Sequence, residues 1–229
     1  MQMVIIAGGL ATRLKQISSK TPKSMIEVLD KPFLLYQIEL LKKHDIKDIV
    51  LCIGHYGDQI KQYFGSGQKF GVHIEYSDEG ENLLGTGGAL RKAHNLLKDD
   101  FFVMWGDSYL LLDYQDIYST YKRSNNLGLM VVYKNLNKGD KSNVAIKNNQ
   151  VVLYDKWSDR KDLIYIDNGV SVFNRKILDL IPENKVFALE EIFKHLVFKG
   201  DLLAYKTEQK FYEIGSFDGI KEFANLIKE

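Results

Sequence analysis

Cysteine, proline and long apolar runs are scarce in this chain of 229 residues, and each shortage excludes a class of protein. Cys52 is the only cysteine, so the chain cannot contain an internal disulfide framework. No apolar stretch is long enough to span a membrane, and the run from Met3 to Ala7 is too short for the core of a signal peptide. We therefore expect a cytoplasmic protein that makes no membrane contact.

An excess of charge of one sign is also missing. The 31 Lys and Arg residues nearly balance the 30 Asp and Glu residues, and the formal net charge is +1. No basic run is long enough to indicate a nucleic-acid partner. Because 45% of the residues are hydrophobic and no Pro/Gly/Ser-rich linker or repeat interrupts the chain, we expect a single domain over residues 1–229.

Strands and helices alternate along the first half of the chain. Short apolar runs predict buried strands at 3–7, 48–54, 74–76 and 101–105. Helices are predicted between them, at 32–45, 57–64 and 89–97. This alternation is typical of an α/β fold with a mostly parallel sheet covered on both faces. Beyond Asp113 the strand-like runs are closely spaced and Asn148-Asn149 forms a plausible hairpin turn, so this half should add antiparallel strands.

Gly8 and Gly9 follow directly on the first predicted strand. Ligands of parallel sheets bind at the carboxyl ends of strands, and glycine lets the backbone turn tightly and approach a ligand closely. Backbone N–H groups can cradle phosphates here, while the nearby cations Arg13 and Lys23 neutralise charge. The stretch lacks both GxxxxGK[ST] and GxGxxG, which excludes a Walker loop and a dinucleotide fingerprint.

This loop resembles the signature of the sugar-1-phosphate nucleotidyltransferases, approximately GGxGTRLxPLTxxxPKPM. The chain reads GGLATRL and then TPKSM, and it departs from the pattern at Ala11 and Ser24. The matching positions are Gly8, Gly9, Thr12, Arg13, Leu14, Pro22, Lys23 and Met25. The resemblance covers nearly the whole chain. It implies the nucleotide-diphospho-sugar transferase fold, a three-layer α/β/α sandwich, and a reaction of a nucleoside triphosphate (NTP) with a sugar 1-phosphate that releases pyrophosphate.

The resemblance also implies where the nucleotide lies. The first loop would hold it through Ala7, Gly8, Gly9, Leu10, Ala11 and Thr12. A second glycine cluster, LGTGGAL, would line the nucleobase pocket through Gly85, Thr86 and Gly87. Within this nucleotide-binding half, residues 1–113, we assign Arg13 to the triphosphate and Lys23 to the region of the α-phosphate.

Asp107 follows the predicted strand 101–105, at the same sheet edge as the first loop. The resemblance implies that Asp107 acts in catalysis as a Mg²⁺ ligand, together with Glu213 of the segment EIGS. Mg²⁺ prefers oxygen ligands and takes the remaining ones from phosphate and water. Ser108 stands next to Asp107, so the chain lacks the paired carboxylates of DxD glycosyltransferases.

In the second half, residues 114–229, the resemblance implies the contacts with the sugar 1-phosphate. Asp155 and Lys156 stand where the family has a Glu-Lys pair. Asn168 and Gly169 resemble the family's NxG strand, although an alignment that slips by one residue would give the sugar contact to a neighbour of Asn168.

The segments GGLATRL, KPFL and LGTGGAL are most similar to those of the heptose 1-phosphate guanylyltransferases. This similarity favours GTP and a heptose 1-phosphate as the substrates. Uridylyl-, cytidylyl- or thymidylyltransferases of other sugar 1-phosphates stay open. So does a non-catalytic module that binds nucleotide sugars, although intact Arg13, Lys23 and Asp107 argue against it. A nicotinamide-dependent oxidoreductase is disfavoured by the missing GxGxxG. The attacking phosphate is already ionised at neutral pH, so no Ser/His or Cys/His nucleophile is expected.

Overall fold

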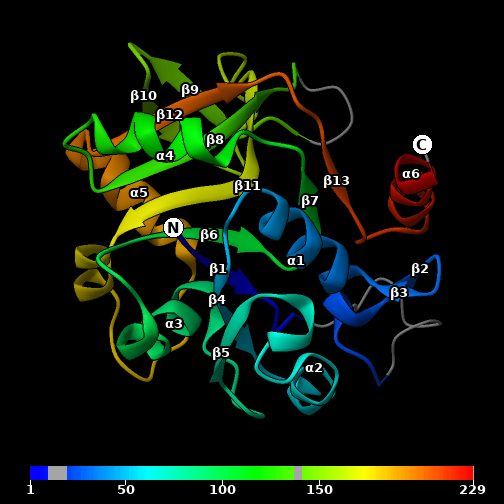
Figure 1. The fold of residues 1–229 in the computed structure, drawn as a ribbon. Coiled ribbons are helices and arrows are strands. Elements are labelled where there is room, and N and C mark those ends of the chain that lie inside the picture. Colours follow the sequence, from blue (N-terminus) through cyan, green and yellow to red (C-terminus); the bar gives the residue numbers. More distant parts are fainter. Residues whose placement is uncertain (10–19, 137–140, 229) are drawn as a thin grey trace.

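A computed structural model describes residues 1–9, 20–136 and 141–228 of the chain. Within these ranges, nine strands form one mixed sheet in the order β5-β4-β1-β6-β11-β8-β12-β10-β9 (Figure 1). Four neighbouring strands are parallel to one another, namely β1 (Gln2–Ile6), β4 (Asp48–Ile53), β5 (His73–Asp78) and β6 (Asp100–Trp105). Their carboxyl ends therefore meet at one edge of the sheet, as the sequence predicts.

The second half of the chain adds five more strands. They are β8 (Gly128–Lys134), β9 (Val144–Lys147), β10 (Gln150–Tyr154), β11 (Tyr165–Asn174) and β12 (Leu202–Thr207). Most of their pairings are antiparallel, but β12 runs parallel to β8. Strand β11 runs antiparallel to both β6 and β8, and so joins the two halves into a continuous sheet. The predicted hairpin turn is confirmed, because Asn148 and Asn149 between β9 and β10 both have positive φ, 51° and 58°.

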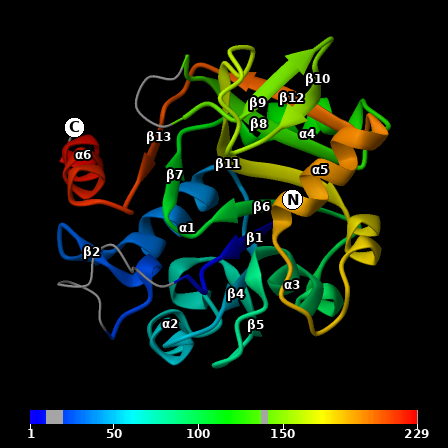
Figure 2. The same cartoon turned by 180° about the vertical axis from the view of Figure 1, so that it is seen from behind.

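Helices cover both faces of the sheet. One face packs against α1 (Phe33–Lys43), α2 (Gly57–Phe64) and α4 (Tyr114–Lys122), and the other against α3 (Gly85–Lys92) and α5 (Leu189–Lys199). Figures 1 and 2 show these two layers from opposite sides. Strand β1 explains the double burial: Met3 and Ile5 enter one core and Val4 the other, since successive side chains of a strand alternate between faces. The three-layer α/β/α fold class is thus confirmed.

The C-terminal helix α6 (Phe217–Lys228) lies outside these layers. Its fully buried Phe223 packs edge-on against the rings of Phe33 and Tyr36 in α1. Two small two-stranded sheets lie nearby: β2 (Glu27–Val28) with β3 (Lys31–Pro32), and β7 (Ser108–Leu110) with β13 (Phe211–Glu213). The β7–β13 ribbon brings the C-terminal segment to the end of β6. Short 3₁₀ helices lie at Lys23–Met25, Gln68–Phe70, His94–Leu96 and Arg175–Leu180.

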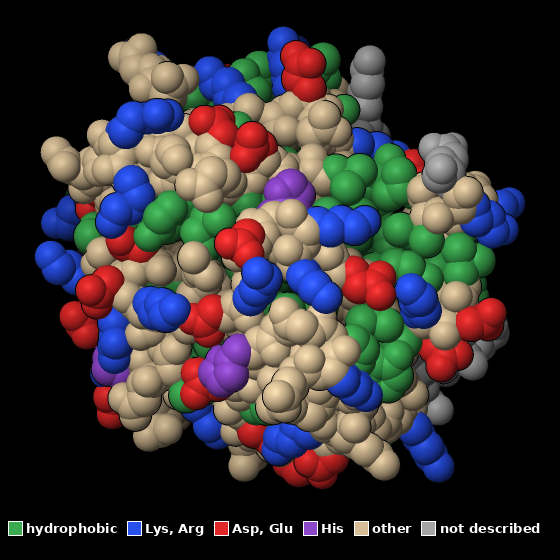
Figure 3. Space-filling model, in the orientation of Figure 1, with side chains coloured by type: hydrophobic (Ala, Val, Ile, Leu, Met, Phe, Trp, Pro, Cys, Tyr) green, Lys and Arg blue, Asp and Glu red, His purple; other side chains and the backbone are tan. Residues whose placement is uncertain are grey.

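The surface agrees with the balanced composition. On the face shown in Figure 3, Lys and Arg side chains are interspersed with Asp and Glu, so neither sign dominates that face. Within the described ranges, every helix is too short or too polar to cross a membrane.

Candidate active site

A pocket of about 470 Å³ opens at the carboxyl edge of the parallel strands and continues towards β10 and α5. Its lining joins residues of both halves of the chain. They are Ile6, Ala7, Gly8, Gly9, Lys23, Ser24, Glu79, Leu83, Gly85, Thr86, Trp105, Gly106, Asp107, Tyr154, Lys156, Ala188, Glu190 and Phe193. The pocket therefore contains most of the described residues for which the sequence predicts a site role, and it adds several that the sequence did not indicate.

The first glycine loop lines the pocket through Ala7, Gly8 and Gly9. The Ala7 N–H donates to the Cys52 carbonyl at 2.8 Å, which extends the β1–β4 pairing by one residue. The Lys23 N–H donates to the Gly9 carbonyl at 3.3 Å, so the loop and the second predicted cation are joined through the backbone. The predicted residues Leu10, Ala11, Thr12 and Arg13 lie outside the described residues.

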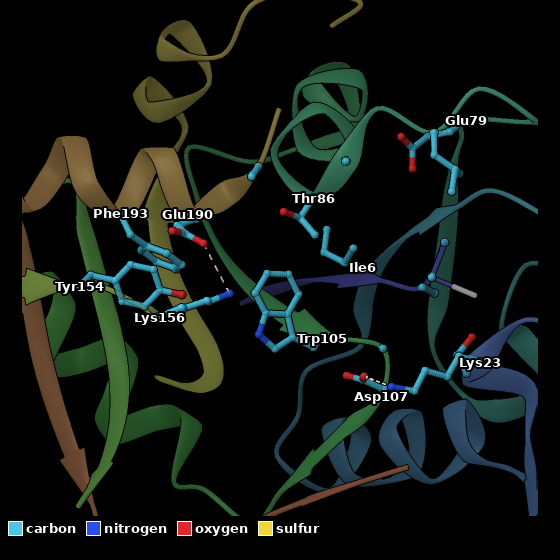
Figure 4. Close-up of a pocket in the computed structure, with 18 residues that line it drawn as sticks. Ile6, Lys23, Glu79, Thr86, Trp105, Asp107, Tyr154, Lys156, Glu190 and Phe193 are labelled. Carbon is cyan, nitrogen blue, oxygen red and sulfur yellow. Dashed lines mark hydrogen bonds and ion pairs between the residues drawn. The ribbon is translucent and has the colours of Figure 1, made fainter. Parts of the chain in front are cut away.

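Lys23 and Asp107 form an ion pair at the centre of this edge (Figure 4). Their side chains are 20% and 32% exposed, so both groups remain within reach of a ligand in the pocket. Asp107 stands in the tight turn between β6 and β7. Gly106 is required there, because a Cβ at this position would lie 2.7 Å from the Ile6 carbonyl oxygen.

Glu213 lies beside this pair. A strand in the parallel part of the sheet would bring it to this edge, but the three-residue β13 instead pairs antiparallel with β7 in a separate ribbon. In this ribbon Glu213 stands opposite Ser108, and the Ile214 N–H donates to the Asp107 carbonyl at 3.1 Å. The Glu213 carboxylate accepts from the Gly215 N–H at 3.0 Å. The two predicted metal ligands are therefore neighbours, and their donor atoms are all oxygen, which fits Mg²⁺.

The second glycine cluster begins a helix four residues earlier than we expected. Helix α3 starts at Gly85, which has a φ of +73°. Gly85 and Thr86 line the pocket, whereas the Gly87 N–H donates to the Phe187 carbonyl at 2.9 Å. Thr86 Oγ1 accepts from the Leu189 N–H at 2.9 Å, which ties the start of α3 to the start of α5.

Glu79, at the end of β5, is a pocket residue that the sequence analysis missed. It is 8% exposed, and its Oε1 accepts from the Leu84 N–H at 2.6 Å, which closes the loop before α3. Burial raises the pKa of this carboxyl above its usual value, although the Leu84 hydrogen bond opposes the shift. The only signal in the sequence is position, since Glu79 stands between the predicted strand 74–76 and the cluster LGTGG.

The far end of the pocket is formed by the second half of the chain. Lys156 points into it and lies 3.9 Å from the Glu190 carboxylate (Figure 4). Glu190 also pairs with Lys194 at 2.8 Å. Aromatic side chains surround Lys156, since Tyr154, Phe193 and Trp105 all line the pocket. Glu190, Tyr154 and Trp105 were not predicted, because each lies in an element that reads as ordinary core or surface.

The other predicted sugar-side residues lie apart from the pocket lining. Asp155 Oδ1 accepts from the N–H groups of Trp157 at 2.8 Å and Ser158 at 3.1 Å, so it stabilises the turn that carries Lys156. Asn168 is 1% exposed, and neither its Oδ1 nor its Nδ2 has a partner among the described residues. Gly169 has a φ of +87°, and a Cβ on it would lie 2.8 Å from Trp105 Cδ1.

Asp167, rather than Asn168, is directed towards the Lys156 side of β11. Its Oδ2 accepts from the Tyr154 hydroxyl at 3.4 Å and its Oδ1 from the Gly169 N–H at 3.0 Å. Burial raises the pKa of Asp167 despite these hydrogen bonds and the nearby Lys156 charge. Asp167 is one of the neighbours of Asn168 to which a shift of one residue in the alignment would give the sugar contact, and that contact stays a prediction.

A further group of potential metal ligands lies at the opposite edge of the sheet. Asp48, His73 and Glu75 offer ligand atoms within 4.8 Å of one another. Asp48 is already engaged, because Lys98 pairs with it and Gln2 Nε2 lies 3.5 Å from it. This group is far from the glycine loops in the topology, since it stands at the amino ends of β4 and β5.

Comparison with known proteins gives a consistent result over the whole chain. A family model described as nucleotidyl transferase matches residues 2–229. The chain is 30% identical over 216 residues to a D-glycero-alpha-D-manno-heptose 1-phosphate guanylyltransferase of Campylobacter jejuni, and the match covers 94% of this chain and 95% of that protein. It is also 30% identical to a mannose-1-phosphate guanyltransferase of Gibberella zeae, of which it spans only 61%.

Solved structures agree in fold. HddC from Yersinia pseudotuberculosis is 26% identical, has a TM-score of 0.82 and matches over 99% of both chains. The structure of HddC complexed with GMP-PN has a TM-score of 0.79 over the same coverage.

Proposed function

The chain belongs to the nucleotidyl transferase family as a sugar-1-phosphate nucleotidyltransferase, and we propose that it transfers a guanylyl group from GTP to a heptose 1-phosphate with the help of Mg²⁺. The observation that carries this proposal is the continuity of the pocket. One end holds the Gly8-Gly9 loop with Lys23 and Asp107, and the other end holds Lys156. Two anionic substrates can therefore meet with their phosphates between two cations.

The reaction needs positioning and charge neutralisation rather than a strong base. An ionised oxygen of the sugar phosphate attacks the α-phosphorus of the triphosphate, and the bond from that phosphorus to the oxygen bridging it to the β-phosphorus breaks. Pyrophosphate carries away the electron pair, and no proton has to move. Lys23 would stabilise the charge on the transferring phosphate, and Lys156 would orient the attacking phosphate.

Asp107 and Glu213 would hold the metal. Both carboxylates flank the β7–β13 ribbon, and the Lys23–Asp107 pair shows that this corner accommodates positive charge. Bound Mg²⁺ would supply further neutralisation of the phosphate oxygens. We further propose that residues 1–113 hold the nucleotide and residues 114–229 the sugar within one domain. Since nucleoside triphosphates are made and used in the cytoplasm, we place the reaction there.

The proposal for guanine rests on Glu79. Its carboxylate is buried at the base side of the pocket, next to Gly8 and the start of α3. Guanine presents two neighbouring donors, N1–H and N2–H, which suit a carboxylate, whereas cytosine presents no N–H at the corresponding ring position. The guanylyltransferase relatives from Campylobacter jejuni and Gibberella zeae, and the GMP-PN complex of HddC, support this choice. The first of these relatives also motivates the heptose 1-phosphate.

A substrate screen tests the proposal directly. The four NTPs are each paired with heptose, mannose and glucose 1-phosphates, and pyrophosphate release is measured with Mg²⁺ and with a chelator. We expect turnover with GTP and a heptose 1-phosphate, and none with the chelator. Release with UTP alone would refute the choice of base, and no release with any pair would indicate a non-catalytic binding module.

The variant Glu79→Gln tests whether Glu79 recognises the nucleobase. Glu79→Gln offers one acceptor and one donor in place of two acceptors, so the preference for GTP over UTP should fall by about tenfold. An unchanged preference would show that another residue reads the base.

A further inference from the structure

The turn that carries Asp107 is held from several sides. The Gly106 N–H donates to the Ile6 carbonyl of β1 at 3.0 Å. The Asp107 carbonyl accepts from the Ile214 N–H, which ties the turn to the segment after β13. A third attachment comes from helix α1, through the side chain of Gln37.

Gln37 is fully buried, and its amide nitrogen lies between the two carbonyls that flank Gly106-Asp107. Nε2 donates to the Trp105 carbonyl at 2.9 Å and to the Ser108 carbonyl at 2.7 Å. Both partners are acceptors, so the orientation of the amide follows from them. One side chain thus bridges the end of β6 and the start of β7 across the turn between them.

The amide oxygen of Gln37, unlike its nitrogen, makes no hydrogen bond to the described residues. This oxygen, Oε1, is also buried. A buried acceptor without a hydrogen bond lowers stability, and such groups are rare in native proteins. The neighbouring buried positions of α1, Ile38 and Leu41, are aliphatic. Packing alone would be served better by an aliphatic side chain at position 37 as well.

We propose that Gln37 is a positioning residue for Asp107, and that it fixes the turn so that the carboxylate meets the metal and Lys23 in one place. Asp107 would touch the metal, while Gln37 acts through the backbone of the turn. This inference rests on the proposed role of Asp107. Misplacement of a reacting group by about 1 Å can cost on the order of a hundredfold in rate.

Two substitutions remove the bridge while keeping the shape. Gln37→Met keeps a similar volume without an amide, and Gln37→Glu keeps the outline without the N–H donors. The matched control is Leu41→Met, a fully buried position one turn further along the same helix. All variants are compared by thermal unfolding, so that a loss of folding is separated from a loss of positioning.

The decisive readouts are metal affinity and the pattern of the kinetic changes. Mn²⁺ is titrated calorimetrically into each protein saturated with a non-hydrolysable GTP analogue. For Gln37→Met and Gln37→Glu we expect Mn²⁺ affinity and kcat each to fall by about tenfold, with the KM for the sugar phosphate unchanged within about twofold. Leu41→Met should match the wild type in all three quantities.

Asp107→Asn separates failure of this inference from failure of the proposed function. If Asp107→Asn is inactive while a folded Gln37→Met binds Mn²⁺ and turns over normally, the positioning role is refuted and the proposed function stands. If Gln37→Met does not fold, Gln37→Glu decides by the same readouts. If Asp107→Asn is fully active, the proposed metal site itself is wrong.

Discussion

At the carboxyl edge of the central sheet, Lys23 and Asp107 face the pocket beside the glycine loops, whereas at the opposite edge Asp100 lines a second pocket but has its hydrogen bonds supplied by neighbouring side chains. Strand β6 shows both situations, since Asp100 begins it and Asp107 stands two residues beyond its last residue, Trp105. Asp107 is partly exposed and its partner Lys23 also lines the pocket. Asp100 is enclosed by Tyr121, Lys122 and Asn174, which all donate to it.

The contrast separates carboxylates that stabilise the fold from carboxylates that can bind a ligand. A carboxylate whose hydrogen bonds are all supplied by the protein stabilises the fold and has little capacity left for a ligand. A carboxylate that faces a cavity with a single cation can exchange that cation for a metal or a substrate phosphate. We therefore expect substitutions at the pocket edge to change activity with little change in stability, and substitutions at the opposite edge to do the reverse.

The largest effect on activity is expected for Asp107→Asn. An amide of the same shape cannot replace an anionic ligand, so kcat should fall by on the order of a thousandfold at ordinary Mg²⁺ and recover little at high Mg²⁺. Pyrophosphate release measures the rate, and chemical denaturation should show little change in unfolding free energy. Full activity of this variant, or a loss explained by unfolding, would break the contrast between the two edges.

Lys156→Met tests whether the two ends of the pocket bind different substrates. Loss of this cation should raise the KM for the sugar 1-phosphate by about tenfold and leave the KM for GTP within about twofold, because only one substrate loses its partner. Lys194→Met is the matched control, since Lys194 also pairs with Glu190 but does not line the pocket. Equal effects on both KM values would place Lys156 elsewhere.

The elements of the fold were largely predictable because their patterns are local. Each expected strand of the parallel half is present, and α2 spans Gly57–Phe64 as expected. Lys23 and Asp107 meet because a loop and a strand end at the same edge, which follows from parallel topology. Their individual roles in the reaction stay predictions.

Contacts between distant segments were not predictable in the same way. The β7–β13 ribbon joins strands of three residues each, too short to show a period, so the route that brings Glu213 to Asp107 was missed. The register shift in β11 between Asp167 and Ser171 could not be read from the sequence, so the contact between Asp167 and the Tyr154 hydroxyl was not predicted. Glu79 and Glu190 read as ordinary acidic residues until the folded chain placed them beside the glycine clusters and Lys156.

Glu213→Asp tests the metal corner with a smaller change. The shorter side chain keeps a carboxylate that can still bind a metal through oxygen, so activity should fall by only a few-fold. Glu213→Ala removes the ligand and should be far weaker. Rates are measured across a Mg²⁺ titration, where Glu213→Asp should need somewhat more metal for half-maximal activity. If Glu213→Asp were as inactive as Glu213→Ala, the two-carboxylate site would be wrong.

The smallest effect on activity is expected for Asp100→Asn, at the edge away from the pocket. Burial alone would raise the pKa of Asp100, but the hydrogen bonds from Lys122, Asn174 and Tyr121 outweigh it and hold the pKa below its usual value. Because the folded pKa lies below the unfolded one, the carboxylate stabilises the protein above about pH 4, and this contribution disappears as the pH falls through the folded pKa.

Asp100→Asn should therefore lower the unfolding free energy by about 1–3 kcal/mol at pH 7, and the deficit relative to the wild type should shrink as the pH is lowered below about 4. Denaturant melts across this range measure both quantities, while kcat and both KM values should stay at wild-type levels. A deficit that does not depend on pH would mean that packing, and not the charge of Asp100, provides the stability. A loss of turnover without a loss of stability would show that the two edges are not separate in function.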